Sequence, residues 1–188
     1  ILQVPINKIM PDKNQPRQHL DLERISNIAN SIKTEGLINP IEIDKDYVIV
    51  TGEIRWRACK EAGLKTISCR MIEISDKDRF RRQVIENIHH NTMNAIDTAR
   101  ALDRLLQSFD KGTKNSHNDS GIRKFCKWLG VSTSFFLDYQ RLFRETSEIQ
   151  EAFIKLDLPI SLVRYFPKVP KQFLSKVRKK IISGEIRK

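Results

Sequence analysis

The spacing of apolar residues changes character partway along this chain of 188 residues. Up to residue 76, short β-branched runs such as "PIEID" and "YVIVT" alternate with stretches that have an apolar residue at every third or fourth position. Strands and helices are therefore predicted in alternation there, whereas the spacing from residue 77 onward is helical throughout. The pattern predicts an α+β protein with a small N-terminal α/β domain at residues 1–76, linking helices at 77–112 and an all-α domain at 113–188.

The clearest local pattern in the helical part is "IRKFCKWLGVSTSFFLDYQRLF", residues 122–143. Cys126 is small enough to let two helices cross closely, Gly130 supplies a turn, and Ser132 can cap the second helix. This is the spacing of a helix-turn-helix, although an ordinary helical hairpin can also contain a glycine turn. The basic residues around it favour DNA binding.

A helix-turn-helix inserts the N-terminal residues of its second helix into the major groove. Asp138 is an unusual residue to find near phosphates, and it can either accept a hydrogen bond from cytosine N4 or pair with a neighbouring arginine. The expected DNA-binding residues are Ser132, Thr133, Ser134, Asp138 and Arg141 on the second helix, with Asp138 and Arg141 on its outer face, and Arg123, Lys124 and Lys127 near phosphates.

Charge is distributed unevenly along the chain, whose net charge is +11. Residues 1–76 hold 11 Lys+Arg and 11 Asp+Glu, whereas residues 77–188 hold 23 and 12. The whole excess of positive charge therefore lies in the helical part. This segregation indicates that only the second part faces a polyanion.

Other classes of protein fit the sequence less well. No apolar run is long enough to cross a bilayer, so we expect no membrane partner and a cytoplasmic location. The three cysteines show no paired spacing, as in a protein of a reducing compartment. His89 and His90 are adjacent and cannot both face one metal ion from a helix, which argues against a zinc site.

A second local pattern is "VIVTGEIRWRACKEAG", residues 48–63, in which a β-branched strand runs through Gly52 into a helix. Such a junction leaves backbone N–H groups at the positive end of a helix dipole, where a phosphate binds well. An anionic ligand is one interpretation, and a solvated surface turn is the other.

Five stretches in order, "NQPR", "LINPIEI", "VIVTGEIRWRACKEAG", "VIENIHHN" and the helix-turn-helix ending in "QRLF", resemble the ParB family of chromosome and plasmid partition proteins. The resemblance covers about residues 1–160. It implies a ParB/sulfiredoxin-like α/β domain followed by a helix-turn-helix domain. It also implies a CTP site, in which a Gly-Glu-Arg-Arg stretch holds the triphosphate and a Glu-Asn stretch holds magnesium and assists hydrolysis.

The residues that match these family stretches form a candidate nucleotide site. Ile54 stands where the family usually has the first arginine of the pair, and His90 stands where it usually has another arginine. The resemblance implies nucleotide binding by Gly52, Glu53 and Arg55, with Arg57 as a further candidate, and it implies magnesium binding and catalysis by Glu86 and Asn87.

The function expected from this resemblance is that of a sequence-specific DNA-binding partition protein. It would bind a centromere-like site, clamp and spread on DNA under a CTP switch, and act as a slow CTPase. The expected partners are double-stranded DNA, a ParA-type ATPase, and a second copy of the chain held through a segment outside this sequence. The protein would be associated with the nucleoid or a plasmid. The alternatives are a transcription regulator without a nucleotide switch, and a nuclease-like or kinase-like enzyme on the same α/β fold.

Overall fold

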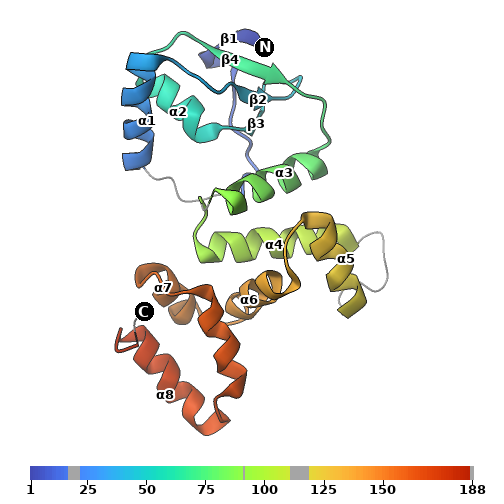
Figure 1. Ribbon diagram of the computed structural model, residues 1–188, viewed down its shortest axis with the longest axis vertical. Coiled ribbons are helices and arrows are strands. Elements are labelled where there is room, and N and C mark those ends of the chain that lie inside the picture. The colour runs from blue at the N-terminus through green and yellow to red at the C-terminus, as the bar shows by residue number, and fades with distance from the viewer. Residues whose placement is uncertain (17–21, 91, 111–118, 187–188) are drawn as a thin grey trace. The chain divides into compact units, whose positions relative to one another are not determined.

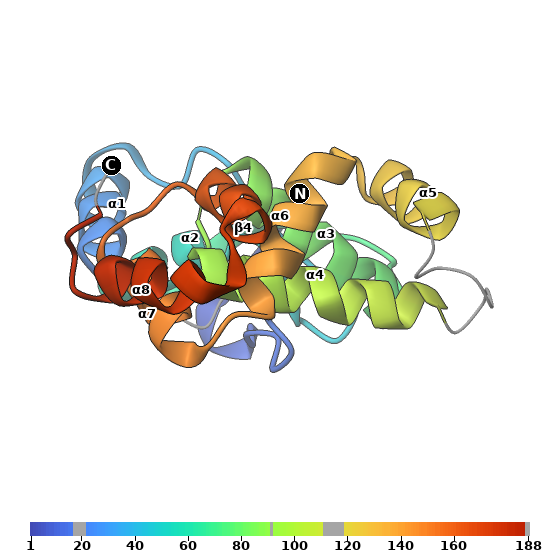
Figure 2. The same ribbon diagram turned by 90° about the horizontal axis from the view of Figure 1, so that it is seen from below.

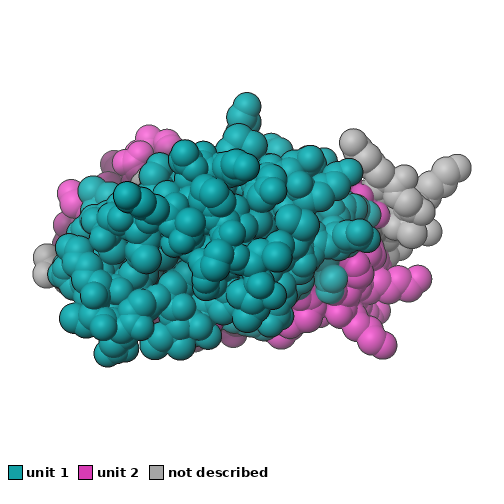
Figure 3. All heavy atoms as spheres, turned by 90° about the horizontal axis from the view of Figure 1, so that it is seen from above, with its two compact units in different colours: residues 1–89 teal, residues 90–188 magenta. Residues whose placement is uncertain are grey.

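The structure is a computed structural model that describes residues 1–16, 22–90, 92–110 and 119–186. The chain divides into two compact units, Ile1–His89 and His90–Lys188 (Figure 3, teal and magenta). The first contains a four-stranded sheet with helices, and the described part of the second contains helices without a strand (Figure 1). The predicted α+β class is confirmed.

The sheet of the first unit has the strand order β1-β4-β2-β3. β1 (Leu2–Pro5) pairs antiparallel with β4 (Thr66–Met71), which pairs parallel with β2 (Ile41–Ile43). β2 and β3 (Ile49–Thr51) form an antiparallel hairpin, in which Val48 and Asp46 donate backbone hydrogen bonds to the Asp44 carboxylate. These β2 and β3 strands are the runs in which the sequence predicts strands.

The described part of the first unit also contains three α-helices and a short 3₁₀ helix, η1 (Ile6–Lys8). The α-helices are α1 (Leu22–Glu35), α2 (Glu53–Glu61) and α3 (Asp76–His89). α1 packs against α2, and α3 packs against β3. The buried core that joins the sheet to α1 and α2 is rich in isoleucine and also contains Trp56, Cys59 and Cys69. This core holds the β3–α2 junction in place.

The described part of the second unit consists of α4 (Ala95–Asp110), α5 (Asp119–Leu129), α6 (Thr133–Phe143), α7 (Ser147–Lys155), η2 (Ile160–Lys168) and α8 (Lys171–Ile182). α4 packs against α6 and α7, while η2 packs against α6. α7 and α8 lie against each other (Figures 1 and 2). None of the helices in the described ranges is long and apolar enough to span a bilayer.

The division of the chain differs from the one that we predict from sequence. The linking helices expected at 77–112 are split between the units, because α3 belongs to the first and α4 to the second. Phe80 and Val84 of α3 are buried, and Arg79 of α3 forms an ion pair with Asp44 in the β2–β3 turn. These contacts attach α3 to the sheet. The expected boundary between 112 and 113 lies outside the described residues.

Candidate nucleic-acid interface and nucleotide site

The turn between α5 and α6 is built by local hydrogen bonds. Gly130 adopts a left-handed conformation with φ of +80°, and the backbone N–H groups of Gly130 and Val131 both donate to the Cys126 carbonyl. Ser132 then caps α6, since its Oγ accepts a hydrogen bond from the Phe135 N–H at 3.0 Å. The turn glycine and the helix cap that the sequence suggests are therefore both present in these positions.

Aromatic packing joins the two helices behind this turn. Phe125 of α5 and Phe136 of α6 meet edge to face with ring centroids 5.2 Å apart. Both rings are fully buried, and Cys126 beside them is also buried. Burial raises the pKa of the Cys126 thiol, so Cys126 stays a small neutral packing residue. These contacts fix α6 against α5 with one face of each helix covered.

The predicted DNA-binding side chains differ in their exposure. Thr133 is half-buried, and Asp138 is buried. The exposed members are Arg123, Lys124 and Lys127 of α5 and Ser132, Ser134 and Arg141 at or on α6. The outer surface of this helix pair is therefore polar and basic, while its inner surface is aromatic.

The expectation that Asp138 lies on the outer face of α6 is wrong. The residue is 1% exposed, because η2 packs over this face of α6. Its carboxylate accepts two hydrogen bonds from Nε of Arg164, at 2.8 and 2.7 Å, and one from Nη1 of Arg141 at 3.1 Å. Of the two roles considered for Asp138, pairing with an arginine is the one that the structure shows.

Arg164 is the residue of this surface that sequence reasoning missed. It lies in η2, and its Nη2 donates a hydrogen bond to Ser134 Oγ in the first turn of α6 at 2.7 Å. The hydrogen bonds to Asp138 raise the pKa of its guanidinium further above the ordinary value. The only signal in the sequence was Asp138 itself, an acid on a helix that is expected to lie near phosphates.

The β3–α2 junction in the first unit requires a glycine. Gly52 caps α2 in a left-handed conformation with φ of +97°, and a Cβ at this position would lie 2.8 Å from Cγ2 of Ile41. As a glycine, the cap residue has no side chain that could hydrogen-bond to the first N–H groups of α2. The first N–H groups of a helix have no partners within the helix, and such groups can bind an anionic ligand.

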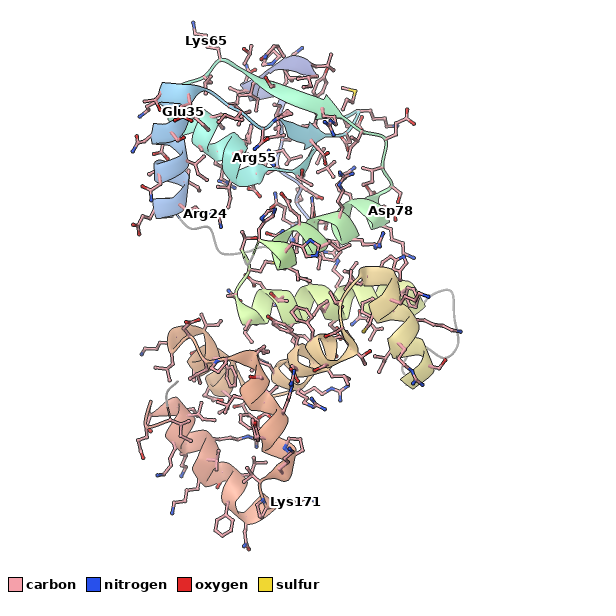
Figure 4. All side chains as sticks on the ribbon, in the orientation of Figure 1. Arg24, Glu35, Arg55, Lys65, Asp78 and Lys171 are labelled. Carbon is pink, nitrogen blue, oxygen red and sulfur yellow. The ribbon has the colours of Figure 1, made fainter. Side chains whose placement is uncertain are left out.

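Arg55 and Glu86 meet beside this glycine. Arg55, labelled in Figure 4, donates from Nη1 to the backbone carbonyls of Asn39 and Pro40 at 2.9 and 2.8 Å. Its Nη2 lies 3.9 Å from Oε1 of Glu86 on α3, and also close to the Gly52 backbone. The structure thus brings together three of the predicted nucleotide-site residues from two helices and a turn.

The other predicted members of this site have partners on their own helices. Arg57 donates to Oε1 of Glu53 from Nε and Nη2 at 2.8 and 2.6 Å, so these opposite charges are paired along α2. Asn87 donates to the Gln83 carbonyl within α3. Ile54 packs against the core of the first unit, and His90 is exposed. Arg55 is therefore the cation that stands at the glycine.

The donor set fits a nucleotide phosphate with magnesium. A helix N-terminus that begins at a glycine and a guanidinium are groups that bind phosphate. Glu86 supplies a carboxylate beside them, and Mg²⁺ in nucleotide sites takes only one or two protein oxygens in addition to phosphate oxygens and water. The described ranges contain no group of three or more His, Cys, Asp or Glu residues that could hold a metal ion. Binding of a metal here would therefore depend on phosphate oxygens.

Comparison with known proteins places this chain in a family. The ParB N-terminal domain model matches residues 1–88. A protein of Rickettsia prowazekii, described as a probable chromosome-partitioning protein ParB, is 32% identical over 148 residues, which are 79% of this chain and 49% of that protein. The chromosome-partitioning protein ParB of Myxococcus xanthus is 36% identical over 112 residues, 58% of this chain and 38% of that protein.

A similar solved structure extends the match over both units. It is the C-terminally truncated chromosome-partitioning protein ParB of Caulobacter crescentus, complexed to the centromeric parS site. The match has a TM-score of 0.70 and 25% identity and covers 99% of this chain and 94% of that one. The chain spans about half the length of the curated relatives that it matches over the longest stretches. From the matching domain model, the named relatives and the shared fold of both units, it follows that this chain belongs to the ParB family.

Proposed function

We propose that this protein is a sequence-specific DNA-binding partition protein, in which the N-terminal part of α6 reads bases and the basic residues of α5 bind phosphates. The observation that carries the proposal is the exposed polar start of α6 beside exposed Arg123, Lys124 and Lys127, on a helix pair whose other face is an aromatic core. This is the arrangement that helix-turn-helix proteins present to the major groove.

The charges of the two units support the proposal. Residues 1–89 hold 15 Lys+Arg and 13 Asp+Glu, whereas residues 90–188 hold 19 and 10. With the boundary where the structure places it, most of the excess of positive charge, +9 of +11, remains with the second unit. The parS complex of the Caulobacter relative supports a centromere-like site as the target.

Selection from a genomic fragment library at physiological salt, against excess competitor DNA, tests this function. We expect one recurring site to be enriched. Lys127→Ala should then weaken binding to all sequences alike and reduce the salt dependence by about one ion, because a phosphate contact is lost. Lys155→Ala, an exposed lysine of α7, is the matched control and should change neither. Selection that enriches no site would refute sequence-specific binding.

The same proposal includes a nucleotide switch in the first unit. CTP phosphates would bind at Gly52 and Arg55, and Glu86 with Asn87 would hold the phosphate-bound magnesium and support slow hydrolysis. When bound, magnesium would neutralise phosphate charge. A CTP-dependent clamp on DNA, a second copy of the chain and a ParA-type ATPase would complete the partition function in the nucleoid or on a plasmid.

Calorimetry with CTP and magnesium tests the switch. Arg55→Ala should weaken CTP binding at least tenfold, as expected for a lost charged hydrogen-bonding group in a phosphate site. Arg24→Ala, an exposed arginine on α1, is the matched control. Equal CTP affinity in wild type and Arg55→Ala would show that the phosphate assignment is wrong.

A transcription regulator without a nucleotide switch is the second candidate. Ile54 favours it, because its side chain packs against the core where the family usually places an arginine. In that case the selection would enrich a site, and calorimetry would detect no CTP binding.

A further inference from the structure

One buried carboxylate organises the side chains at the start of α6. Asp138 holds Arg164 and Arg141, whose side chains are 47% and 43% exposed. Arg164 reaches this position from η2, a segment outside the α5–α6 pair, and also contacts Ser134. A guanidinium from a distant part of the chain is therefore fixed beside the first turn of the candidate recognition helix.

The geometry leaves part of this guanidinium available to a ligand. The hydrogen bonds to Asp138 and Ser134 use Nε and Nη2 of Arg164. Within the described part of the chain, neither N–H group of Nη1 has a hydrogen-bond acceptor. Ser134 accepts the bond from Arg164, so its own hydroxyl proton can be donated elsewhere.

Fixing an arginine in this way suits base recognition. An unrestrained arginine side chain has about 2 kcal/mol of rotamer entropy, part of which is lost on binding, and a preorganised fork loses less. With Nε and Nη2 of Arg164 already engaged, the N–H groups of Nη1 remain to donate to an acceptor at a base edge in the major groove, such as O6 or N7 of guanine. The guanidinium of Arg164 is also held beside the first turn of α6, the part of a helix-turn-helix that meets the bases.

We propose that Arg164 is a specificity-determining residue that contacts a base edge next to the position of Ser134, and that Asp138 is the positioning residue that holds it there. This inference rests on the proposed DNA binding. It adds a base-reading side chain from outside the helix-turn-helix, and it gives the acid on α6 a role that involves no direct contact with DNA.

The test uses the full chain and the site enriched by the selection, together with all single base-pair variants of that site. Arg164→Ala removes the contact, Arg164→Lys keeps the charge without the planar fork, and Asp138→Asn keeps one acceptor for Arg164. Arg100→Ala is the matched control, because Arg100 on α4 is 50% exposed and pairs with a buried aspartate, Asp97. Thermal unfolding of each variant shows whether it is folded.

We expect Arg164→Ala and Arg164→Lys each to lose about tenfold in discrimination at one or two base pairs, with the other positions unchanged. Asp138→Asn should show a smaller loss at the same base pairs, and Arg100→Ala none. A loss that is equal at every base pair, with a reduced salt dependence, would identify a phosphate contact and overturn the proposal. Discrimination equal to wild type in folded Arg164→Lys would also overturn it. If the wild type enriches no site, the proposed function itself fails.

Discussion

Gly52 occupies a position where a residue with a side chain would be strained. Its φ of +97° is strained for any residue with a Cβ, and that Cβ would collide with Ile41 at 2.8 Å. We therefore expect Gly52→Ala to lower the free energy of unfolding by about 2–3 kcal/mol. Chemical denaturation of the two variants Gly52→Ala and Gly63→Ala measures this effect.

Gly63 is the matched control for this substitution. It also has a left-handed conformation, with φ of +81°, but no atom lies within 4 Å of a Cβ added there. Gly63→Ala should cost only about 1–2 kcal/mol, the strain of the left-handed conformation. Equal destabilisation by the two substitutions would show that the collision with Ile41 is relieved by a small shift of that side chain.

Cys59 and Cys69 are the second pair of residues with a measurable consequence. Burial raises the pKa of each thiol from 9.0 to about 11, and the neighbouring Cys59 contributes to the shift at Cys69. Only a thiolate attacks an alkylating reagent, so both side chains should resist iodoacetamide at pH 8 in the folded chain and react in urea. Mass spectrometry of the labelled peptides measures this difference.

The same shifts predict the direction of a pH effect on stability. Well below pH 9 both thiols are mostly protonated in the folded and the unfolded chain. Between pH 9 and about 11 the unfolded chain loses protons that the folded chain keeps, so the free energy of unfolding should fall as pH rises through this window. Rapid native labelling at pH 8 would contradict the burial of both thiols.

At the scale of elements, the start of α6 depends on one hydroxyl. Ser132 Oγ accepts the Phe135 N–H at 3.0 Å, and loss of such a cap costs about 1 kcal/mol. Ser132→Ala should lower the melting temperature of the second unit by several degrees, as measured by calorimetry. Ser161→Ala, an exposed serine in η2, should leave the melting temperature unchanged within about a degree.

Local patterns made several elements predictable. "PIEID" and "YVIVT" are β2 and β3, and the glycine-terminated stretch before residue 36 is α1. α3 shows where such patterns stop being informative. Its apolar spacing identifies a helix, but its attachment to the first unit depends on the ion pair between Arg79 and Asp44, which are far apart in sequence.

The candidate sites follow the same rule. Gly52 and Ser132 each stand at the start of a helix that the local pattern predicts, and the structure places them there. The burial of Asp138 was not predictable, because η2 covers it and Arg164 is contributed by that distant segment. A single sequence does not reveal the burial of side chains whose hydrogen-bond partners are far away in the chain.

At the scale of the whole molecule, the division into units gives a further prediction. Each unit has its own buried core, so fragments 1–89 and 90–188 should each fold alone, with cooperative unfolding seen by circular dichroism. Fragment 90–188 should retain the salt dependence of DNA binding, and fragment 1–89 should not bind DNA. A fragment 90–188 without DNA affinity would show that both units are needed for binding.

The pairing of α6 with η2 limits how this protein can be re-engineered. Grafting α6 alone onto a related scaffold would bury Asp138 with Arg141 but without Arg164, which donates the closer hydrogen bonds, and a buried carboxylate that loses such a partner is destabilising. Chimaeras intended to exchange target preference should therefore transplant residues 132–168 as one cassette.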